Sequence, residues 1–194
     1  MGKVEVCSEK CLLDDFFRVD EATLSFERFD GSMSPRVRRL VFERGDSAAA
    51  LVFDRDTNVL LFTEQFRFPA YRKGEGWPLE LMAGTVEEGE TPEATVRREL
   101  EEELGYRPGD LASVATFFVS PGGSSERIHL FYAEVTAAMR VGKGGGAAAE
   151  HEDIRIVRRS VDETRAALAA GQLTDAKTLI GVQWFLNHGL HGSV

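Results

Sequence analysis

Apolar residues recur along this chain in short runs of strand length, bounded by charged and turn-forming residues. The two strongest runs span residues 48–53 and 59–67, and the polar residues 54–58 between them are typical of a turn. Further strands are predicted at residues 23–29, 38–42, 79–82, 112–118, 129–135 and 154–158. The pattern therefore predicts a chain with many short strands.

Two helices are predicted after the last of these strands. Ser160 begins the first, because Glu163 three residues later completes a capping box. Thr174 or Asp175 begins the second, which continues towards Asn187. Strands and helices in mixed order favour an α/β/α sandwich built on a mixed sheet.

A further helix is predicted earlier in the chain, at residues 92–104. Thr91 is a favourable N-cap, Pro92 suits the first helical position, and Gly105 supplies the C-terminal stop. One stripe of this helix is apolar and is expected to face the core: Val96, Leu100 and Leu104.

The same helix carries a dense cluster of carboxylates. Residues 84–106, GTVEEGETPEATVRRELEEELGY, contain eight glutamates and two arginines, with Glu99 and Glu103 one turn apart beside Glu102. Like charges at this spacing repel one another, and Mg²⁺ or Mn²⁺ would offset the repulsion because hard cations bind carboxylate oxygens. A solvated surface helix would explain residues 101–103 alone. It does not explain the fixed spacing of glycine, glutamate and arginine in the whole segment.

That spacing resembles the Nudix box. Gly84 is followed after five residues by Glu90 and, after seven more, by the sequence RELEEELGY at residues 98–106, so that every fixed position is filled. The resemblance implies the Nudix fold and metal-dependent hydrolysis of a nucleoside diphosphate linked to another group. It says little about that group.

The resemblance also assigns roles within the box. It implies that Glu99 and Glu103 are the principal metal ligands, with Glu102 and the carbonyl of Ala83 as further ligands. Arg98 would orient the carboxylates through charge-assisted hydrogen bonds. Glu90 is then expected to be a structural partner of this arginine, and Gly84 would let the chain turn tightly beside the metal.

Two segments outside the box bear on the substrate. Arg67 precedes an aromatic-rich turn and is a candidate phosphate contact, although it is equally a plain surface arginine. The loop SPGGSSER, residues 120–127, is a simple Gly- and Ser-rich turn or a ligand-binding loop. It resembles the SPGG loop of ADP-ribose pyrophosphatases, with Pro121 sixteen residues after the last glycine of the box. Glu126 is then a candidate for substrate or metal contact.

A third segment, GGGAAAEHED at residues 144–153, joins three glycines and three alanines to an acidic cluster. Its composition fits a disordered surface loop or a flexible tether that brings a carboxylate to the site. The ADP-ribose pyrophosphatase resemblance implies a base or an extra metal ligand here. Glu150 and Glu152 are both candidates.

The N-terminal part is expected to be an additional antiparallel sheet. We predict residues 1–47 as this extension and residues 48–194 as the Nudix hydrolase domain. In similar enzymes the extension is exchanged between two subunits, which implies a homodimer and makes Arg39 a candidate substrate-binding residue.

Charge, hydropathy and cysteine content argue against several other classes of protein. A net charge of −9 argues against a nucleic-acid-binding surface, and no apolar run reaches the roughly 20 residues that span a bilayer. The N-terminus has no signal-peptide core, so a cytoplasmic location is predicted. Cys7 and Cys11 are expected to be reduced thiols.

The sequence thus predicts a Mg²⁺-dependent pyrophosphatase, with Mn²⁺ as the alternative metal, that splits ADP-ribose into AMP and ribose 5-phosphate. A GDP-mannose hydrolase is the nearest alternative, because its loops would look alike. A non-catalytic sensor of a nucleotide sugar is a third interpretation, which the complete box disfavours.

Overall fold

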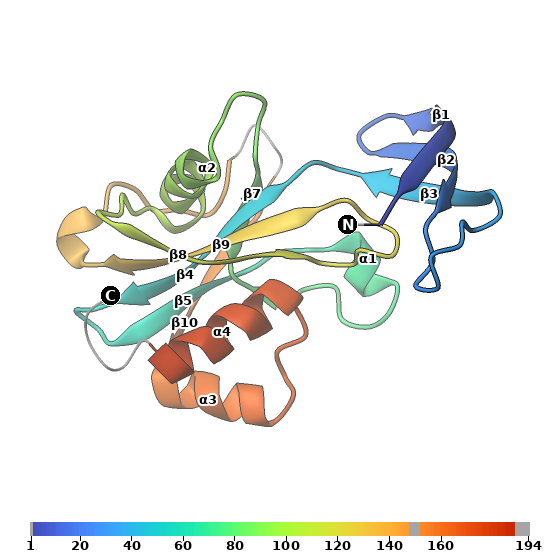
Figure 1. Ribbon diagram of the computed structural model, residues 1–194. Helices are drawn as coiled ribbons and strands as arrows, with labels where there is room; N and C mark the ends of the chain where they lie inside the picture. The colour runs from blue at the N-terminus through green and yellow to red at the C-terminus, as the bar shows by residue number, and fades with distance from the viewer. Residues whose placement is uncertain (1, 148–151, 189–194) are drawn as a thin grey trace. The chain divides into compact units, whose positions relative to one another are not determined.

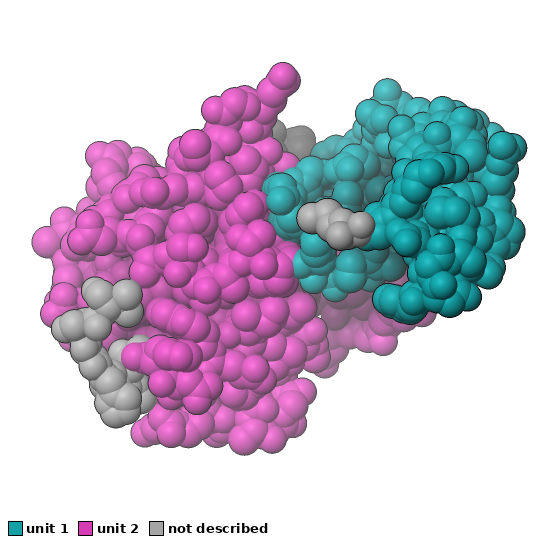
Figure 2. All heavy atoms as spheres, viewed as in Figure 1, with its two compact units in different colours: residues 1–46, 118–127 teal, residues 47–117, 128–194 magenta. Residues whose placement is uncertain are grey.

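The two strongest apolar runs of the sequence form neighbouring antiparallel strands, β4 (Ser47–Asp54) and β5 (Val59–Glu64), in the computed structural model (Figure 1). The structure describes residues 2–147 and 152–188. They fall into unit 1, residues 1–46 and 118–127, and unit 2, residues 47–117 and 128–194 (Figure 2). Each unit is built on its own sheet.

The main sheet is mixed. Its strand order is β10-β5-β4-β9-β8, where β9 (Arg127–Val135) runs parallel to β4 and β10 (Arg155–Ser160) runs antiparallel to β5. The strand β8 (Leu111–Phe118) lies at the other edge. A parallel neighbour on one side and an antiparallel one on the other give the mixed sheet that the sequence predicts.

Helices cover both faces of this sheet. Figure 1 shows α2 (Pro92–Glu99) on one face, and α3 (Val161–Ala169) with α4 (Ala176–His188) on the other. Successive β4 side chains alternate between the two cores, since Ala50 and Val52 pack on the α2 side and Leu51 packs on the α4 side. The predicted α/β/α sandwich is confirmed.

Unit 1 contains the predicted N-terminal antiparallel sheet. It consists of β1 (Val4–Asp14), β2 (Arg18–Phe26) and β3 (Val37–Glu43), in that order. The strand β1 was not predicted. All of its residues are exposed, so the sequence carries no buried face that would mark it.

The segment predicted as one strand at residues 79–82 is divided between two partners. The strand β6 (Leu79–Glu80) pairs with β5, whereas β7 (Met82–Thr85) pairs with β4. The predicted strand at 59–67 ends at Glu64, and a short helix, α1 (Phe68–Tyr71), follows. The second of these strands, β7, places Gly84 against Glu99 on the helix of the box.

The predicted helix at residues 92–104 is correct in extent but not in type throughout. It is α-helical to Glu99 and continues as a π-helix, η1 (Leu100–Leu104). The carbonyls of Glu102 and Glu103 lie in the last turn of this helix and accept hydrogen bonds from a distant loop, through Gly146 N–H at 3.1 Å and Gly145 N–H at 2.9 Å. A short 3₁₀ turn (Ala137–Met139) follows β9.

The two C-terminal helices begin as predicted. Ser160 Oγ accepts a hydrogen bond from Glu163 N–H at 3.2 Å, and the Glu163 carboxylate accepts one from Ser160 N–H at 2.8 Å. Asp175 precedes α4 and accepts from Thr178 N–H at 3.0 Å. Within the described residues, no helix is both long and apolar enough to cross a membrane.

Candidate active site

The N-cap residue Thr91 and the following proline determine where α2 begins. Thr91 Oγ1 accepts a hydrogen bond from Ala94 N–H at 3.2 Å, and Pro92 occupies the first turn. Gly105 ends the π-helix with a φ of 77°, a left-handed conformation that favours glycine. The apolar stripe of Val96, Leu100 and Leu104 is fully buried. Glu99 and Glu103 lie beside this stripe, so packing of the stripe holds their carboxylates at a fixed register.

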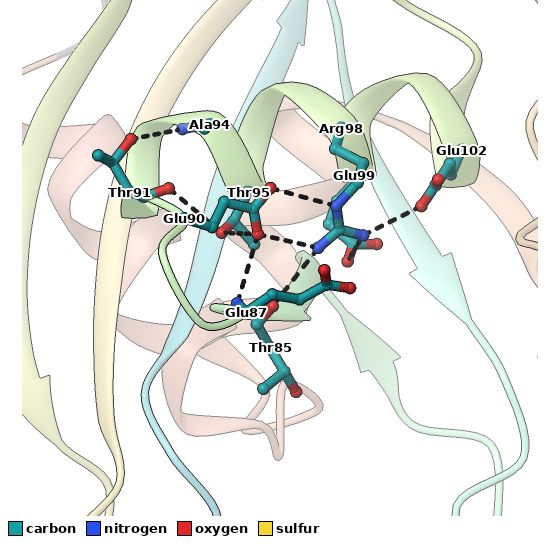
Figure 3. A network of polar contacts seen from close by, with 9 residues as sticks. All are labelled: Thr85, Glu87, Glu90, Thr91, Ala94, Thr95, Arg98, Glu99 and Glu102. Atoms are coloured by element: carbon teal, nitrogen blue, oxygen red, sulfur yellow. Dashed lines mark hydrogen bonds and ion pairs between the residues drawn. The ribbon is translucent and has the colours of Figure 1, made fainter.

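Arg98 is the centre of a polar network on this helix (Figure 3). Its Nη1 donates to Glu99 Oε1 at 2.7 Å and to Glu102 Oε2 at 3.2 Å, and its Nη2 donates to Glu90 Oε2 at 3.3 Å. The carbonyl of Thr85, at the end of β7, accepts a further bond at 3.4 Å. Arg98 thus ties three glutamates to β7.

The network fixes the charge states of its members. Burial alone would lower the pKa of Arg98, but the hydrogen bonds and charges of Glu90 and Glu99 raise it, so the guanidinium stays charged. The hydrogen bond from Arg98, together with one from Thr95 at 2.7 Å, lowers the pKa of Glu90. Glu90 therefore has the contacts of a structural partner to Arg98.

Glu99 lies directly against the backbone of Gly84. A Cβ atom at Gly84 would stand 1.8 Å from Glu99 Oε1 and 2.2 Å from its Cδ, so only glycine leaves space for this carboxylate. Glu99 is buried, and burial raises its pKa, to which the charges of Glu102 and Glu152 add while Arg98 opposes them. The close approach brings Glu99 to the strand that carries Ala83.

Glu103 is the most deeply buried carboxylate of the box, with 1% of its surface exposed. Its Oε2 atom has no hydrogen-bond partner among the described residues. Burial, followed by the charges of Glu99 and Glu152, raises the pKa of Glu103 to about 9. An unpaired buried carboxylate costs free energy, which indicates that a cation belongs beside it.

The donor set fits a hard divalent cation. Glu99 and Glu103 supply carboxylate oxygens, Glu102 is half-buried beside them, and Ala83 offers a backbone carbonyl next to Gly84. In the described part of the chain, no three His, Cys, Asp or Glu side chains stand close enough to hold an ion by themselves. Mg²⁺ binds through one or two carboxylates and completes its shell with water and substrate phosphate, so this sparse set suits it.

Arg67 is held near these carboxylates by a buried ion-pair chain. Arg67 Nε donates to Glu80 Oε2 at 2.8 Å, and Lys177 Nζ from α4 donates to Glu80 Oε1 at 2.7 Å. Burial would raise the pKa of Glu80, but the charges of Lys177 and Arg67 outweigh it and lower the pKa. The guanidinium charge of Arg67 also opposes the rise in the pKa of Glu103.

Glu80 and Lys177 were missed from the sequence. The signal for Glu80 is a carboxylate inside the apolar run Leu79-Glu80-Leu81-Met82, and the signal for Lys177 is a lysine on the buried side of a helix. Both side chains are buried to more than nine-tenths. Neither signal reveals the partner, because the two residues stand 97 positions apart.

Replacing Lys177 with methionine is expected to lower the free energy of unfolding by about 3 kcal/mol, because it leaves the buried Glu80 short of one cation. Combining it with Glu80→Gln should recover part of the loss, because the uncompensated charge is then removed. Urea unfolding measures both effects. The exposed Lys143→Met is the control. Equal losses in the single and double variants would contradict the prediction.

The remaining candidate residues lie in both units. Glu152 is half-buried in unit 2, and its charge contributes to the raised pKa of both Glu99 and Glu103. Glu150 lies outside the described residues. Arg39 and Glu126 belong to unit 1. Arg39 is exposed on β3, and Glu126 is buried, with Oε1 at 3.5 Å from Arg44 Nε.

A mixed sheet between two helical layers, with buried glutamates on the helix after β7, defines an α/β/α sandwich with a carboxylate-rich site. The sequence profile described as the NUDIX domain matches residues 43–179. The chain therefore belongs to the Nudix family.

Individual relatives are similar over nearly the whole chain. The ADP-ribose pyrophosphatase of Escherichia coli (strain K12) is 38% identical over 186 residues, which cover 95% of this chain and 88% of that protein. The GDP-mannose pyrophosphatase of Cronobacter sakazakii is 34% identical over 189 residues, 96% of this chain and 97% of that protein. The GDP-mannose pyrophosphatase of Citrobacter koseri is 33% identical over 193 residues, 98% and 96% respectively.

Proposed function

We propose that this protein hydrolyses the diphosphate of ADP-ribose, or of a similar nucleoside diphosphate sugar, with a divalent cation. The observation that carries the proposal is the buried Glu103 carboxylate near Glu99, whose Oε2 has no hydrogen-bond partner among the described residues. Two buried carboxylates repel each other, and a cation would give both a partner. The relatives named ADP-ribose pyrophosphatase support the choice of substrate.

The reaction breaks one P–O bond of the diphosphate bridge. A water oxygen forms a new bond to one phosphorus, and the other phosphate leaves with the bridging oxygen, so that ADP-ribose gives AMP and ribose 5-phosphate. Mg²⁺, with Mn²⁺ as the alternative, would offset phosphate charge and lower the pKa of the attacking water. Its proposed ligands are Glu99, Glu103, Glu102 and the carbonyl of Ala83.

The other candidate residues accept the proton of the attacking water, orient the metal ligands or neutralise the charge of the diphosphate. Glu150 or Glu152 accepts the proton of the attacking water. Arg98 holds Glu99 and Glu102 in place through its two Nη1 contacts. Arg67, anchored by Glu80, and Arg39 of the N-terminal sheet neutralise the diphosphate oxygens.

GDP-mannose is the alternative substrate. The relatives that bear this name align over 97% and 96% of their own lengths, more than the 88% of the E. coli ADP-ribose pyrophosphatase. The proposed metal ligands and Arg67 would serve either substrate, because both carry the same diphosphate. The choice between them therefore depends on groups that contact the base and the sugar.

We further propose a cytoplasmic homodimer, in which the N-terminal extension at residues 1–47 is shared between two copies of the hydrolase domain at residues 48–194. Unit 1 exposes several large apolar side chains, which supports a partner surface: Val4, Val6, Leu12, Leu13, Phe16 and Phe29. Light scattering on the purified protein tests this assembly. A monomer at micromolar concentration would overturn it.

Product analysis tests the proposed function directly. With Mg²⁺ present, we expect the protein to convert ADP-ribose into AMP and ribose 5-phosphate faster than it converts GDP-mannose, UDP-glucose, NADH or 8-oxo-dGTP. Adding EDTA should stop turnover, and restoring Mg²⁺ or Mn²⁺ should recover it. Preference for GDP-mannose would keep the metal site and replace the substrate. Nucleotide-sugar binding without turnover under any metal would instead indicate a non-catalytic sensor.

A further inference from the structure

Three consecutive glycines precede the acidic segment, and two of them form backbone hydrogen bonds with the helix of the box. Residues 144, 145 and 146 have φ values of 70°, 107° and 88°, all in the left-handed region that favours glycine. Gly145 N–H donates to the carbonyl of Glu103 at 2.9 Å, and Gly146 N–H donates to that of Glu102 at 3.1 Å. Instead of a free tether, this glycine segment is a backbone cap on the π-helix that carries two proposed metal ligands.

The same segment encloses the side chain of Glu152. Glu152 Oε2 accepts a hydrogen bond from Ala147 N–H at 3.1 Å. A Cβ atom at Gly146 would lie 2.7 Å from Glu152 Cβ and 2.8 Å from Glu152 Oε2, closer than side-chain atoms pack. Glycine at position 146 is therefore required for Glu152 to occupy this place.

The position of Glu152 matters because its charge affects the carboxylates of the box. Its charge is among the causes that raise the pKa of both Glu99 and Glu103. In addition, Ile154 N–H donates to the carbonyl of Gly145 at 3.2 Å, which fixes the chain on the other side of Glu152. Because Gly145 and Gly146 also bond to the carbonyls of Glu103 and Glu102, these backbone contacts hold the segment that carries Glu152 against the helix of the proposed metal ligands.

We propose that Gly146 is a positioning residue that holds Glu152 beside Glu99 and Glu103 and thereby sets the affinity of the site for its divalent cation. The inference rests on the proposed metal-dependent function. Glu152 contributes negative charge to the site before substrate arrives, and the glycine segment links its position to the backbone of Glu102 and Glu103. A side chain at position 146 would displace Glu152 and weaken this contribution.

Gly146→Ala and Gly145→Ala form a matched pair for the test. Both place alanine at a positive φ, but a Cβ at Gly145 would have its nearest neighbour, Ile154 O, at 3.8 Å, which is ordinary contact. Backbone strain is thus common to the two variants, and collision with Glu152 is particular to Gly146→Ala. Thermal unfolding of the metal-free proteins shows whether the two variants lose the same amount of stability.

The decisive readout is Mn²⁺ affinity, measured by calorimetry without substrate. We expect Gly146→Ala to bind Mn²⁺ about tenfold more weakly than Gly145→Ala, within the range for residues that orient metal ligands. In a Glu152→Gln background, Gly146→Ala should cause little further loss, because the carboxylate it displaces is already neutral. Equal affinities for the two glycine variants, or an undiminished loss in the Glu152→Gln background, would overturn the proposal.

Glu152→Gln alone keeps the test valid if Gly146→Ala does not fold. It should weaken Mn²⁺ binding, whereas the neighbouring exposed Asp153→Asn should not. Unchanged affinity in Glu152→Gln would refute the positioning role. Because the assay contains no substrate, the expected affinities together with no turnover of any nucleotide sugar would refute the proposed function alone.

Discussion

Replacing Glu103 with glutamine should stabilise the metal-free protein and abolish its response to metal. The side chain is buried, its Oε2 has no hydrogen-bond partner among the described residues, and its pKa is raised to about 9. In the unfolded chain the same group ionises near 4.5. Unfolding at neutral pH therefore releases a proton, and the glutamine variant avoids this cost.

The sign of the pH dependence follows from that difference. Below pH 4.5 both states hold the proton, so Glu103 costs nothing there, and its penalty grows as the pH rises from about 4.5 to about 9. At pH 7 the glutamine variant should be more stable than the metal-free wild type by roughly 1–3 kcal/mol. Urea unfolding in EDTA at pH 5 and at pH 8 measures this widening gap.

With Mg²⁺ present the order should reverse. Metal should raise the melting temperature of the wild type and leave that of Glu103→Gln nearly unchanged, because a binder of the folded state stabilises it by mass action. Turnover should fall by about a thousandfold, more than the 10–100-fold typical of groups that only orient ligands. Glu101→Gln, an exposed change on the same helix, is the control. Full activity in Glu103→Gln would remove Glu103 from the metal site.

Replacing Gly84 with alanine should disable the site through a single methyl group. The new Cβ would stand 1.8 Å from Glu99 Oε1 and 2.5 Å from its Cγ, so the Glu99 side chain must leave its place. We expect the protein to fold, because a side chain rather than backbone yields. Activity should fall about a hundredfold or more, and metal affinity should fall with it.

Two other glycines separate this effect from general damage. A Cβ atom at Gly74 would have no neighbouring atom within 4 Å, so Gly74→Ala should behave as wild type. Gly89, in the same loop as Glu90, has open space but a φ of 82°, so Gly89→Ala should lose stability without losing metal affinity. Wild-type Mn²⁺ affinity in Gly84→Ala would show that Glu99 is not a ligand.

The sequence predicted the features that depend on local chemistry. Alternating and continuous apolar runs marked most strands of the main sheet, and the caps at Thr91 and Ser160 marked helix starts to the residue. The box gave the family and the register of its glutamates, since the spacing of residues on one helix fixes which of them share a face. The contact between Glu90 and Arg98 was also expected from the box.

Only the tertiary structure decided the rest, because it depends on residues far apart in the chain. The burial of Glu103 and its unpaired oxygen come from packing, and the anchoring of Arg67 through Glu80 requires Lys177 from the last helix. The glycine cap on the π-helix joins residues some 40 positions apart, so periodicity and composition had indicated only a regular helix followed by a disordered loop or a flexible tether. The sequence by itself determined which groups can hold a cation, and the fold decided which of them are buried, paired and fixed in place, because burial and pairing depend on packing across the chain.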